Sequence, residues 1–244
     1  MRRLIILPLL FIMQWSWSQE YTADSASFVL ANKVIEAMGG KQAFEETAYI
    51  GWQFFASRQL IWDKVHDRIR IDYLKKNISI IADLHGDNIK LFMNGNEIYD
   101  ADSLKKYAAK AQLIWMNDSY WLIMPFKLLD PGVNLKYLGM QNSIDGNEAH
   151  VIELTFNKVG ATPENKYRIF IDPATHYVVQ WNYYETYDDP QPEFINSWGQ
   201  YEKYGKIFLS GDRGTEGTLS KIHVWDELPE YIFSDMKIPP LSEL

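Results

Sequence analysis

The chain has 244 residues, of which 24 are basic and 32 acidic, so its formal net charge is −8. This acidity argues against a nucleic-acid partner, because binding along a phosphate backbone depends on clustered basic residues. The sequence contains no cysteine, which excludes disulfides, thiolate metal sites, a cysteine nucleophile and the lipid-modified cysteine of a bacterial lipoprotein.

The first eighteen residues, 1–18, have the pattern of a cleavable secretory signal peptide. Arg2 and Arg3 give a positive start, an apolar stretch follows, and the small residue Ser18 predicts cleavage before Gln19. The apolar stretch is shorter than the ~20 residues needed to span a bilayer, and no later segment is long enough. We therefore expect a mature protein that is soluble in the periplasm or secreted, and that does not itself span a membrane.

The mature chain begins with a predicted amphipathic helix over residues 25–38. Apolar residues recur there at helical spacing, with Asp24 and Ser25 as candidate N-caps and Gly39-Gly40 as a stop signal. Residues 41–46 predict a short further turn of helix before the hydrophobic period changes to two.

From residue 49 onward the chain has the pattern of an antiparallel meander with one buried face. Alternation is clear over 68–73, where the two isoleucines and Tyr73 face one way and the two arginines and Asp72 the other. The same alternation recurs in residues 150–156, 167–171 and 177–183. Turn signals separate the strands at His85-Gly86-Asp87, Asn94-Gly95-Asn96, Asp145-Gly146-Asn147 and Asp172-Pro173.

A helical insertion interrupts the meander between Ser103 and Met124. Its first half is rich in Lys, Ala and Leu, and the run from Trp115 to Phe126 is unusually apolar and aromatic for a surface connection. This combination predicts helix, in one or two pieces, that covers the concave face of a single curved antiparallel sheet. Residues 19–244 contain no linker or repeat, so we expect one mainly β, α+β domain.

The sequence contains no recognisable catalytic or metal-binding signature. Its five histidines are widely spaced, there is no Gly-x-Ser-x-Gly elbow, and the glycine-rich stretch 210–217 lacks a phosphate-binding Gly-Lys-Ser/Thr and is interpreted as a loop. We therefore expect no catalytic residue, no metal and no cofactor.

A cluster of carboxylates leaves an enzymatic alternative open. Glu185, Asp188, Asp189 and Glu193 lie near a tyrosine-rich strand, and paired carboxylates are what a secreted glycan-processing enzyme needs. The surrounding Asp-Asp-Pro-Gln-Pro composition favours a solvated loop instead.

Aromatic residues make up 15% of the chain, and they admit two interpretations. They can fill a solid core, as in a structural or partner-binding envelope protein without a cavity. They can also line an apolar cavity for an acyl chain, where each buried methylene contributes ~0.8 kcal/mol. The candidate lining residues are Trp52, Phe54, Ile69, Ile71, Leu91, Trp115, Trp121, Trp181 and Tyr183.

Several phrases resemble the LolA family of periplasmic lipoprotein carriers. Residues 67–73 are similar to that family's early Arg-rich strand, 80–92 to its pair of apolar strands around a glycine turn, and 167–175 to its strand ending in Asp-Pro. Residues 38–40, Met-Gly-Gly, and 125–132, Pro-Phe-Lys-Leu-Leu-Asp-Pro-Gly, are closer still to an uncharacterised secreted family of Bacteroidota.

The resemblance implies an incomplete barrel whose helices close an apolar cavity. It implies a non-catalytic shuttle with lipid or lipoprotein acyl chains as ligand, and an envelope membrane protein as a possible partner. In such carriers an arginine bonds to helical carbonyls to hold the lid, and Arg58, Arg68 and Arg70 lie in the corresponding region without any one being assigned.

Overall fold

The computed structural model describes residues 22–86, 88–236 and 240–244, so the expected signal peptide lies outside the described residues. The helices are α1 (Ser25–Ala37), α2 (Lys41–Glu46) and α3 (Ala101–Ile123), with 3-10 turns η1 (Met124–Lys127), η2 (Gly214–Glu216), η3 (Glu230–Phe233) and η4 (Leu241–Glu243). The strands are β1 (Thr22–Ala23), β2 (Tyr49–Phe54), β3 (Arg58–Asp63), β4 (Arg68–Tyr73), β5 (Ile78–Asp83), β6 (Ile89–Met93), β7 (Asn96–Glu97), β8 (Val133–Asn142), β9 (Glu148–Phe156), β10 (Lys166–Ile171), β11 (Val178–Tyr184), β12 (Phe194–Ser197), β13 (Gly199–Tyr204), β14 (Ile207–Asp212) and β15 (Leu219–Trp225).

The strands form three hydrogen-bonded sheets, whereas a single curved sheet was expected. One sheet has the order β15-β2-β3-β4-β5-β6-β7, another β1-β8-β9-β10-β11-β12, and β13 pairs with β14 alone. All pairs are antiparallel except β1 with β8. No pairing among the described residues joins β7 to β1, so the array stays open.

The β13–β14 hairpin connects the two large sheets. On one side the Trp198 N–H donates to the Val179 carbonyl of β11 at 2.8 Å, and on the other Asp212 forms an isolated bridge with Thr218. Gln200 has φ 53, a left-handed conformation that bends the chain where it leaves β12 and enters β13. The bend at Gln200 thus lies where the β11–β12 ladder ends and the β13–β14 ladder begins.

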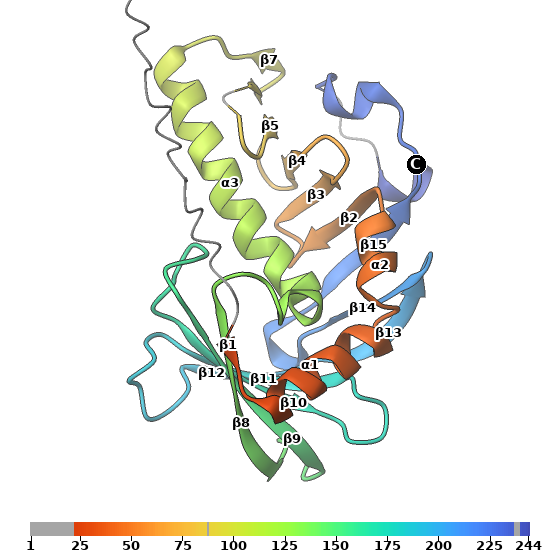
Figure 1. Cartoon of the computed structure of the whole chain (residues 1–244). Helices are drawn as coiled ribbons and strands as arrows, with labels where there is room; N and C mark the ends of the chain where they lie inside the picture. The colour runs from red at the N-terminus through yellow and green to blue at the C-terminus, as the bar shows by residue number, and fades with distance from the viewer. Residues whose placement is uncertain (1–21, 87, 237–239) are drawn as a thin grey trace, which may run out of the picture.

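The three expected helices are confirmed. Asp24 caps α1 by accepting a hydrogen bond from the Ser27 N–H at 2.9 Å, and Asp100 caps α3 through the Ser103 N–H at 2.8 Å. The predicted insertion is one continuous helix, α3, which ends in η1 where Pro125 has no N–H to donate. In Figure 1, α3 starts beside β7 and runs toward the six-stranded sheet. None of the described helices has the length and apolarity needed to cross a membrane.

Strands β2 to β5 of the seven-stranded sheet are buried on both faces, although one solvated face was expected. Ile69 and Ile71 lie in the main core, which also contains residues of α1, α3 and the six-stranded sheet. Arg70 and Asp72 on the opposite face are equally inaccessible. The C-terminal segment covers them, and the Arg70 guanidinium donates to the Ile232 carbonyl at 2.8 Å. A second core lies beneath this segment and contains Tyr49, Ile61, Ile81, Phe92, Ile232, Phe233 and Leu241.

Candidate ligand pocket

A pocket of about 310 Å³ lies along the second half of α3, between the two large sheets. Most of its wall is apolar or aromatic. It is lined by Trp62, Trp115, Met116, Asn117, Ser119, Tyr120, Trp121, Ile123, Lys127, Asp130, Pro131, Val133, Phe156, Val159, Gly160, Ala161, Thr162 and Tyr167. A second hollow, of about 410 Å³, lies at the turns flanking β5 and β6. Its wall contains Asn77, Ser79 and Asn94 and a single aromatic residue, Phe92.

More than one face of the second half of α3 lines this pocket, since Trp115 and Trp121 lie beside a stripe of residues at helical spacing. Met116, Tyr120 and Ile123 follow one another at spacings of four and three, which places them on one face of α3. Leu122 lies on the neighbouring face and is fully buried in the main core. The same helix therefore closes the core and forms one wall of the pocket.

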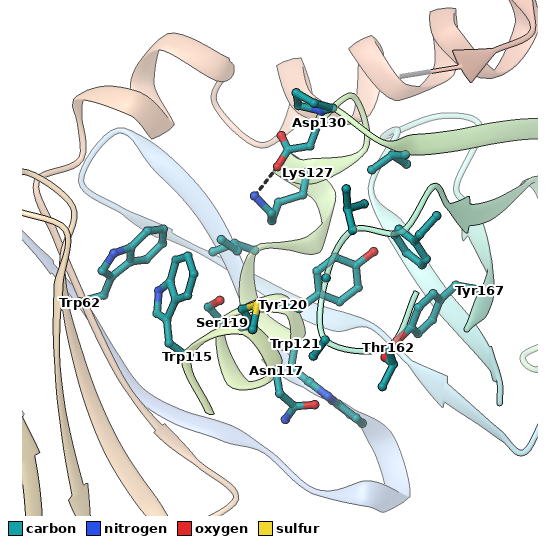
Figure 2. Close-up of a pocket in the computed structure, with 18 residues that line it drawn as sticks. Trp62, Trp115, Asn117, Ser119, Tyr120, Trp121, Lys127, Asp130, Thr162 and Tyr167 are labelled. Atoms are coloured by element: carbon teal, nitrogen blue, oxygen red, sulfur yellow. Dashed lines mark ion pairs between the residues drawn. The ribbon is translucent and has the colours of Figure 1, made fainter. Parts of the chain in front are cut away.

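Two groups of aromatic rings stand on opposite flanks of the pocket (Figure 2). On one flank the Trp62 ring of β3 meets Trp115 edge to face, with centroids 5.3 Å apart. On the other, Tyr120 lies 5.7 Å from Tyr167. Tyr167 in turn stacks on Trp181 at 5.2 Å with an interplanar angle of 14°. Trp181 thus supports the wall from behind.

The tyrosines bring polar atoms into an otherwise apolar space. No hydrogen bond within the described residues involves the hydroxyl of Tyr120 or Tyr167. Burial holds the pKa of Tyr120 well above 10 and also raises the pKa of Tyr167. Both phenols are therefore neutral at physiological pH. The indole nitrogens of Trp62 and Trp115 are also buried without a hydrogen-bond partner in the described part of the chain.

Charge in the pocket wall is confined to one ion pair. Lys127 and Asp130 bond to each other through their side chains, and both are partly exposed (Figure 2). Because these two charges neutralise each other, only uncharged polar groups of the wall are left to form hydrogen bonds with a ligand.

Two arginines tie α3 to neighbouring strands. The first is Arg58 of β3, whose Nε lies 2.7 Å from Oδ2 of Asp118 and whose Nη2 lies 3.0 Å from Oδ1. Such a two-pronged pair fixes both position and orientation. Asp118 is buried, and burial raises the pKa of its carboxyl while the bonds from Arg58 oppose that shift.

The second is Arg213, which the sequence did not single out. Its guanidinium donates to the Trp121 carbonyl near the end of α3, with Nε at 3.2 Å, and to the Ser210 carbonyl at 2.9 Å. It also lies over the Trp198 ring, 3.4 Å from the centroid. Burial lowers the pKa of Arg213 to about 9. The stretch 210–217, interpreted as a loop, is in fact the end of β14 followed by η2.

Arg68 and Arg70 belong to the opposite face of the sheet and do not contact α3. Arg68 bonds to Glu230 at 2.6 Å, and Arg70 bonds to carbonyls of the C-terminal segment. Of the three arginines considered from the sequence, only Arg58 therefore bonds to the insertion helix.

The nine candidate lining residues occupy two layers. Trp115 and Trp121 line the pocket itself. Trp52, Phe54, Ile69, Ile71, Leu91 and Trp181 are buried in the main core, and Tyr183 is partly buried beside Phe194 and Tyr167. Sequence reasoning did not select Tyr120, Phe156 or Tyr167. Their only local signal was periodicity, in α3 for Tyr120 and in alternating strands for the other two.

The carboxylates of residues 185–193 lie on an exposed loop. Glu185, Asp188 and Glu193 are exposed, and Asp189 accepts a hydrogen bond from the Thr186 N–H at 2.7 Å as part of a turn. Lys166 anchors this loop from below by donating to the carbonyls of Tyr187 and Asp189. Across the described ranges, no cluster of three or more histidine, aspartate or glutamate side chains is arranged to hold a metal ion.

Fold and site together define a strand-rich α+β protein with an aromatic pocket under one long helix. No protein-family model and no curated protein sequence matches the chain. Among solved structures, the chain is similar to a DUF1329 family protein from Desulfovibrio piger, with 13% identity and a TM-score of 0.48 over 87% of this chain and 98% of the other.

Two further structures are distantly similar. One is a domain assigned to outer membrane lipoprotein sorting from Vibrio parahaemolyticus, with 11% identity and a TM-score of 0.40 over 82% of this chain and 97% of the other. The second is the lipoprotein LppX of Mycobacterium tuberculosis, with 13% identity and a TM-score of 0.27 over 66% of this chain and 88% of the other.

Proposed function

We propose that this protein is a non-catalytic binding or shuttle protein that holds a lipid or the acyl chains of a lipoprotein in the α3 pocket. The observation that carries the proposal is the pocket itself, a space of about 310 Å³ with aromatic walls on two flanks. Its volume falls within the ~300–1,000 Å³ range of small-molecule sites. Each methylene transferred there from water contributes ~0.8 kcal/mol.

The free hydroxyls define the polar part of such a ligand. Tyr120 and Tyr167 are neutral donors without a protein acceptor, so an ester or amide carbonyl beside an acyl chain suits them. A carboxylate is a poorer match, because an ion loses its hydration in an apolar pocket and the wall offers no unpaired cation.

A ligand larger than the α3 pocket displaces α3 on entry, and the two arginine ties set the cost of that movement. Arg58 holds the middle of the second half of the helix, and Arg213 holds the carbonyl of Trp121. Displacement of the helix extends the pocket into the inner face of the seven-stranded sheet, where Trp52, Ile69, Ile71 and Leu91 lie. In this proposal the inner-face residues serve as lining of the open state.

Native mass spectrometry tests this function. The full chain, expressed with its own leader and purified from the periplasm, is expected to carry a co-purifying lipid that organic solvent extracts. A protein that is consistently empty and whose tryptophan fluorescence does not change on titration with fatty ester or lipopeptide contradicts the proposal.

A blocked variant locates the ligand. Ser119→Phe inserts a ring at a buried position of the pocket wall and is expected to abolish lipid binding. Ala109→Phe adds the same ring on an exposed position of the same helix and serves as the matched control. Equal lipid content in both folded variants contradicts binding at this site.

A further inference from the structure

Lysines from two separate segments meet around the ring of Tyr73, the last residue of β4. Lys76, in the turn between β4 and β5, places its Nζ 5.8 Å from the ring centroid. Lys110 of α3 places its Nζ 5.3 Å from the same ring and 5.6 Å from the ring of Tyr107. The turn and the helix therefore present their positive charges side by side.

The surface around this meeting point combines positive charge with exposed leucine. The turn residues 74–77 are all exposed, and Leu74 is 37% exposed. On α3, Lys106 and Leu113 share the face of Lys110 at spacings of four and three, and Leu113 is 53% exposed. We call the set Leu74, Lys75, Lys76, Lys106, Lys110 and Leu113 the lysine patch.

The charge of the lysine patch is uncompensated. None of the ion pairs formed within the described residues includes one of its four lysines. Asp102 lies one helical turn before Lys106 but forms no ion pair with it, and Asp118 is bound to Arg58. A patch of this kind is conspicuous in a chain whose net charge is −8.

We propose that the lysine patch docks the protein on an anionic lipid surface. Lysine ammonium groups beside exposed leucines match the headgroup region of a bilayer, where the cations bind lipid phosphate and the short apolar side chains enter the acyl boundary. The acidic remainder of the molecule is repelled by the same surface, so only this face is attracted.

Docking at this patch has a consequence for α3. Lys110 and Trp115 lie on the same continuous helix, five residues apart, so the helix that contacts the membrane also forms the pocket wall. The docking proposal rests on different residues from the pocket and is separable from it by experiment.

Vesicle flotation of the full processed protein tests the proposal. Vesicles of pure phosphatidylcholine are compared with vesicles that contain 30% phosphatidylglycerol, at low and high salt. We expect at least tenfold tighter binding to the anionic vesicles and loss of that difference at high salt. Equal binding to both compositions, or no binding to either, overturns the proposal.

Two matched variants assign the surface. The variant Lys75→Ser, Lys76→Ser, Lys106→Ser, Lys110→Ser is expected to lose at least tenfold in binding to the anionic vesicles. The control Lys33→Ser, Lys90→Ser, Lys136→Ser, Lys203→Ser removes the same charge from exposed positions elsewhere and is expected to retain binding. An equal loss of vesicle binding in both variants shows that only net charge matters, and overturns the proposal that the lysine patch is the docking surface.

Further controls separate an effect on vesicle binding from an effect on folding or on the α3 pocket. Circular dichroism and thermal unfolding verify that both variants are folded, and Leu74→Ser alone, at an exposed position, is expected to weaken vesicle binding severalfold. The blocked variant Ser119→Phe is expected to bind anionic vesicles normally, so failure of the pocket and failure of the patch give different results.

Discussion

The Arg213 guanidinium donates to the backbone carbonyl of Trp121, a residue whose side chain lines the pocket. A strand-end arginine thus holds the last turn of the long helix at the point where the helix closes the site. Arg213 and the Arg58–Asp118 pair both hold α3 in place, and substitutions at these residues test that role.

Replacement of Arg213 is expected to loosen the end of α3. Arg213→Met keeps most of the side-chain volume but leaves the carbonyls of Trp121 and Ser210 without their donor, at a cost of about 1–3 kcal/mol in unfolding free energy. Hydrogen exchange of amides 119–124 is expected to accelerate. Arg213→Lys is expected to restore little, because an ammonium cannot reproduce the planar fork. Unchanged hydrogen exchange of these amides in both variants contradicts the view that Arg213 holds the end of α3.

Breaking the Arg58–Asp118 pair is expected to destabilise the protein strongly. Asp118→Leu leaves a partly buried guanidinium without its carboxylate, and loss of one partner of a buried pair costs about 3–5 kcal/mol. The double variant Arg58→Met, Asp118→Leu is expected to regain part of that loss. Urea unfolding of the four proteins gives the coupling energy, and simple additivity of the two single changes speaks against a direct interaction.

Removal of the tyrosine hydroxyls is expected to change ligand preference. Tyr120→Phe and Tyr167→Phe keep the aromatic wall but delete the two free donors, so affinity for a fatty ester is expected to fall about tenfold, equivalent to one hydrogen bond of ~1 kcal/mol or slightly more. Affinity for a hydrocarbon probe of equal length is expected to stay constant. Fluorescence titration with both probes measures the difference, and parallel losses for both show that the hydroxyls do not contact the ligand.

The C-terminal segment is expected to be an integral part of the fold. Phe233→Ala removes a buried ring from the second core and also from its place under the Arg68 guanidinium, which lies 4.3 Å from the ring centroid. A loss of about 3–5 kcal/mol is expected. Tyr231→Ala, at a position that is 49% exposed, is the control and is expected to change stability by less than about 1 kcal/mol. Chemical denaturation distinguishes the two.

The contribution of Lys64 to stability is expected to rise from about pH 8 toward pH 10.5. Burial lowers the pKa of Lys64 to about 8, so within this range the lysine holds its proton more fully in the unfolded chain than in the folded one, and its own contribution to stability increases with pH. The buried tyrosines act in the opposite direction near pH 10, because burial raises their pKa values. Solvent screening of this partly exposed group limits the gain to about 1–2 kcal/mol. Urea unfolding at pH 7.5 and 10.5 measures the change in unfolding free energy with pH, and this change is expected to be less favourable in Lys64→Met than in the wild type. An identical change in both proteins rules out this assignment.

Local sequence was sufficient for most elements. Helix 25–38 follows from the spacing of its apolar residues and from the cap Asp24, and the turns follow from glycine, asparagine and proline. The insertion helix was predicted from spacing alone, so its start at Ala101 behind the cap Asp100 was missed. These features depend on interactions between residues close in the chain. For the same reason the alternation of β4 was predicted correctly residue by residue.

The tertiary structure decided which segments pack against each face of these elements. Alternation in β4 does not reveal that Arg70 is covered by a segment that begins more than 150 positions later, whose carbonyls at Ile232 and Asp235 accept its hydrogen bonds. Nor does it reveal that the meander is divided at the β13–β14 hairpin.

The pocket, too, was predicted in part from the sequence and decided in part by the tertiary structure. The sequence by itself indicated that the aromatic run of 115–126 must cover something, and it supplied Trp115 and Trp121. Only the tertiary structure brought Tyr167 of β10 and Trp62 of β3 to opposite sides of that helix and set Arg213 against its last turn. The physical reason is that hydrophobic burial is non-directional. An apolar pattern predicts that a side chain is buried, whereas its neighbours are chosen by the packing of segments far apart in the chain.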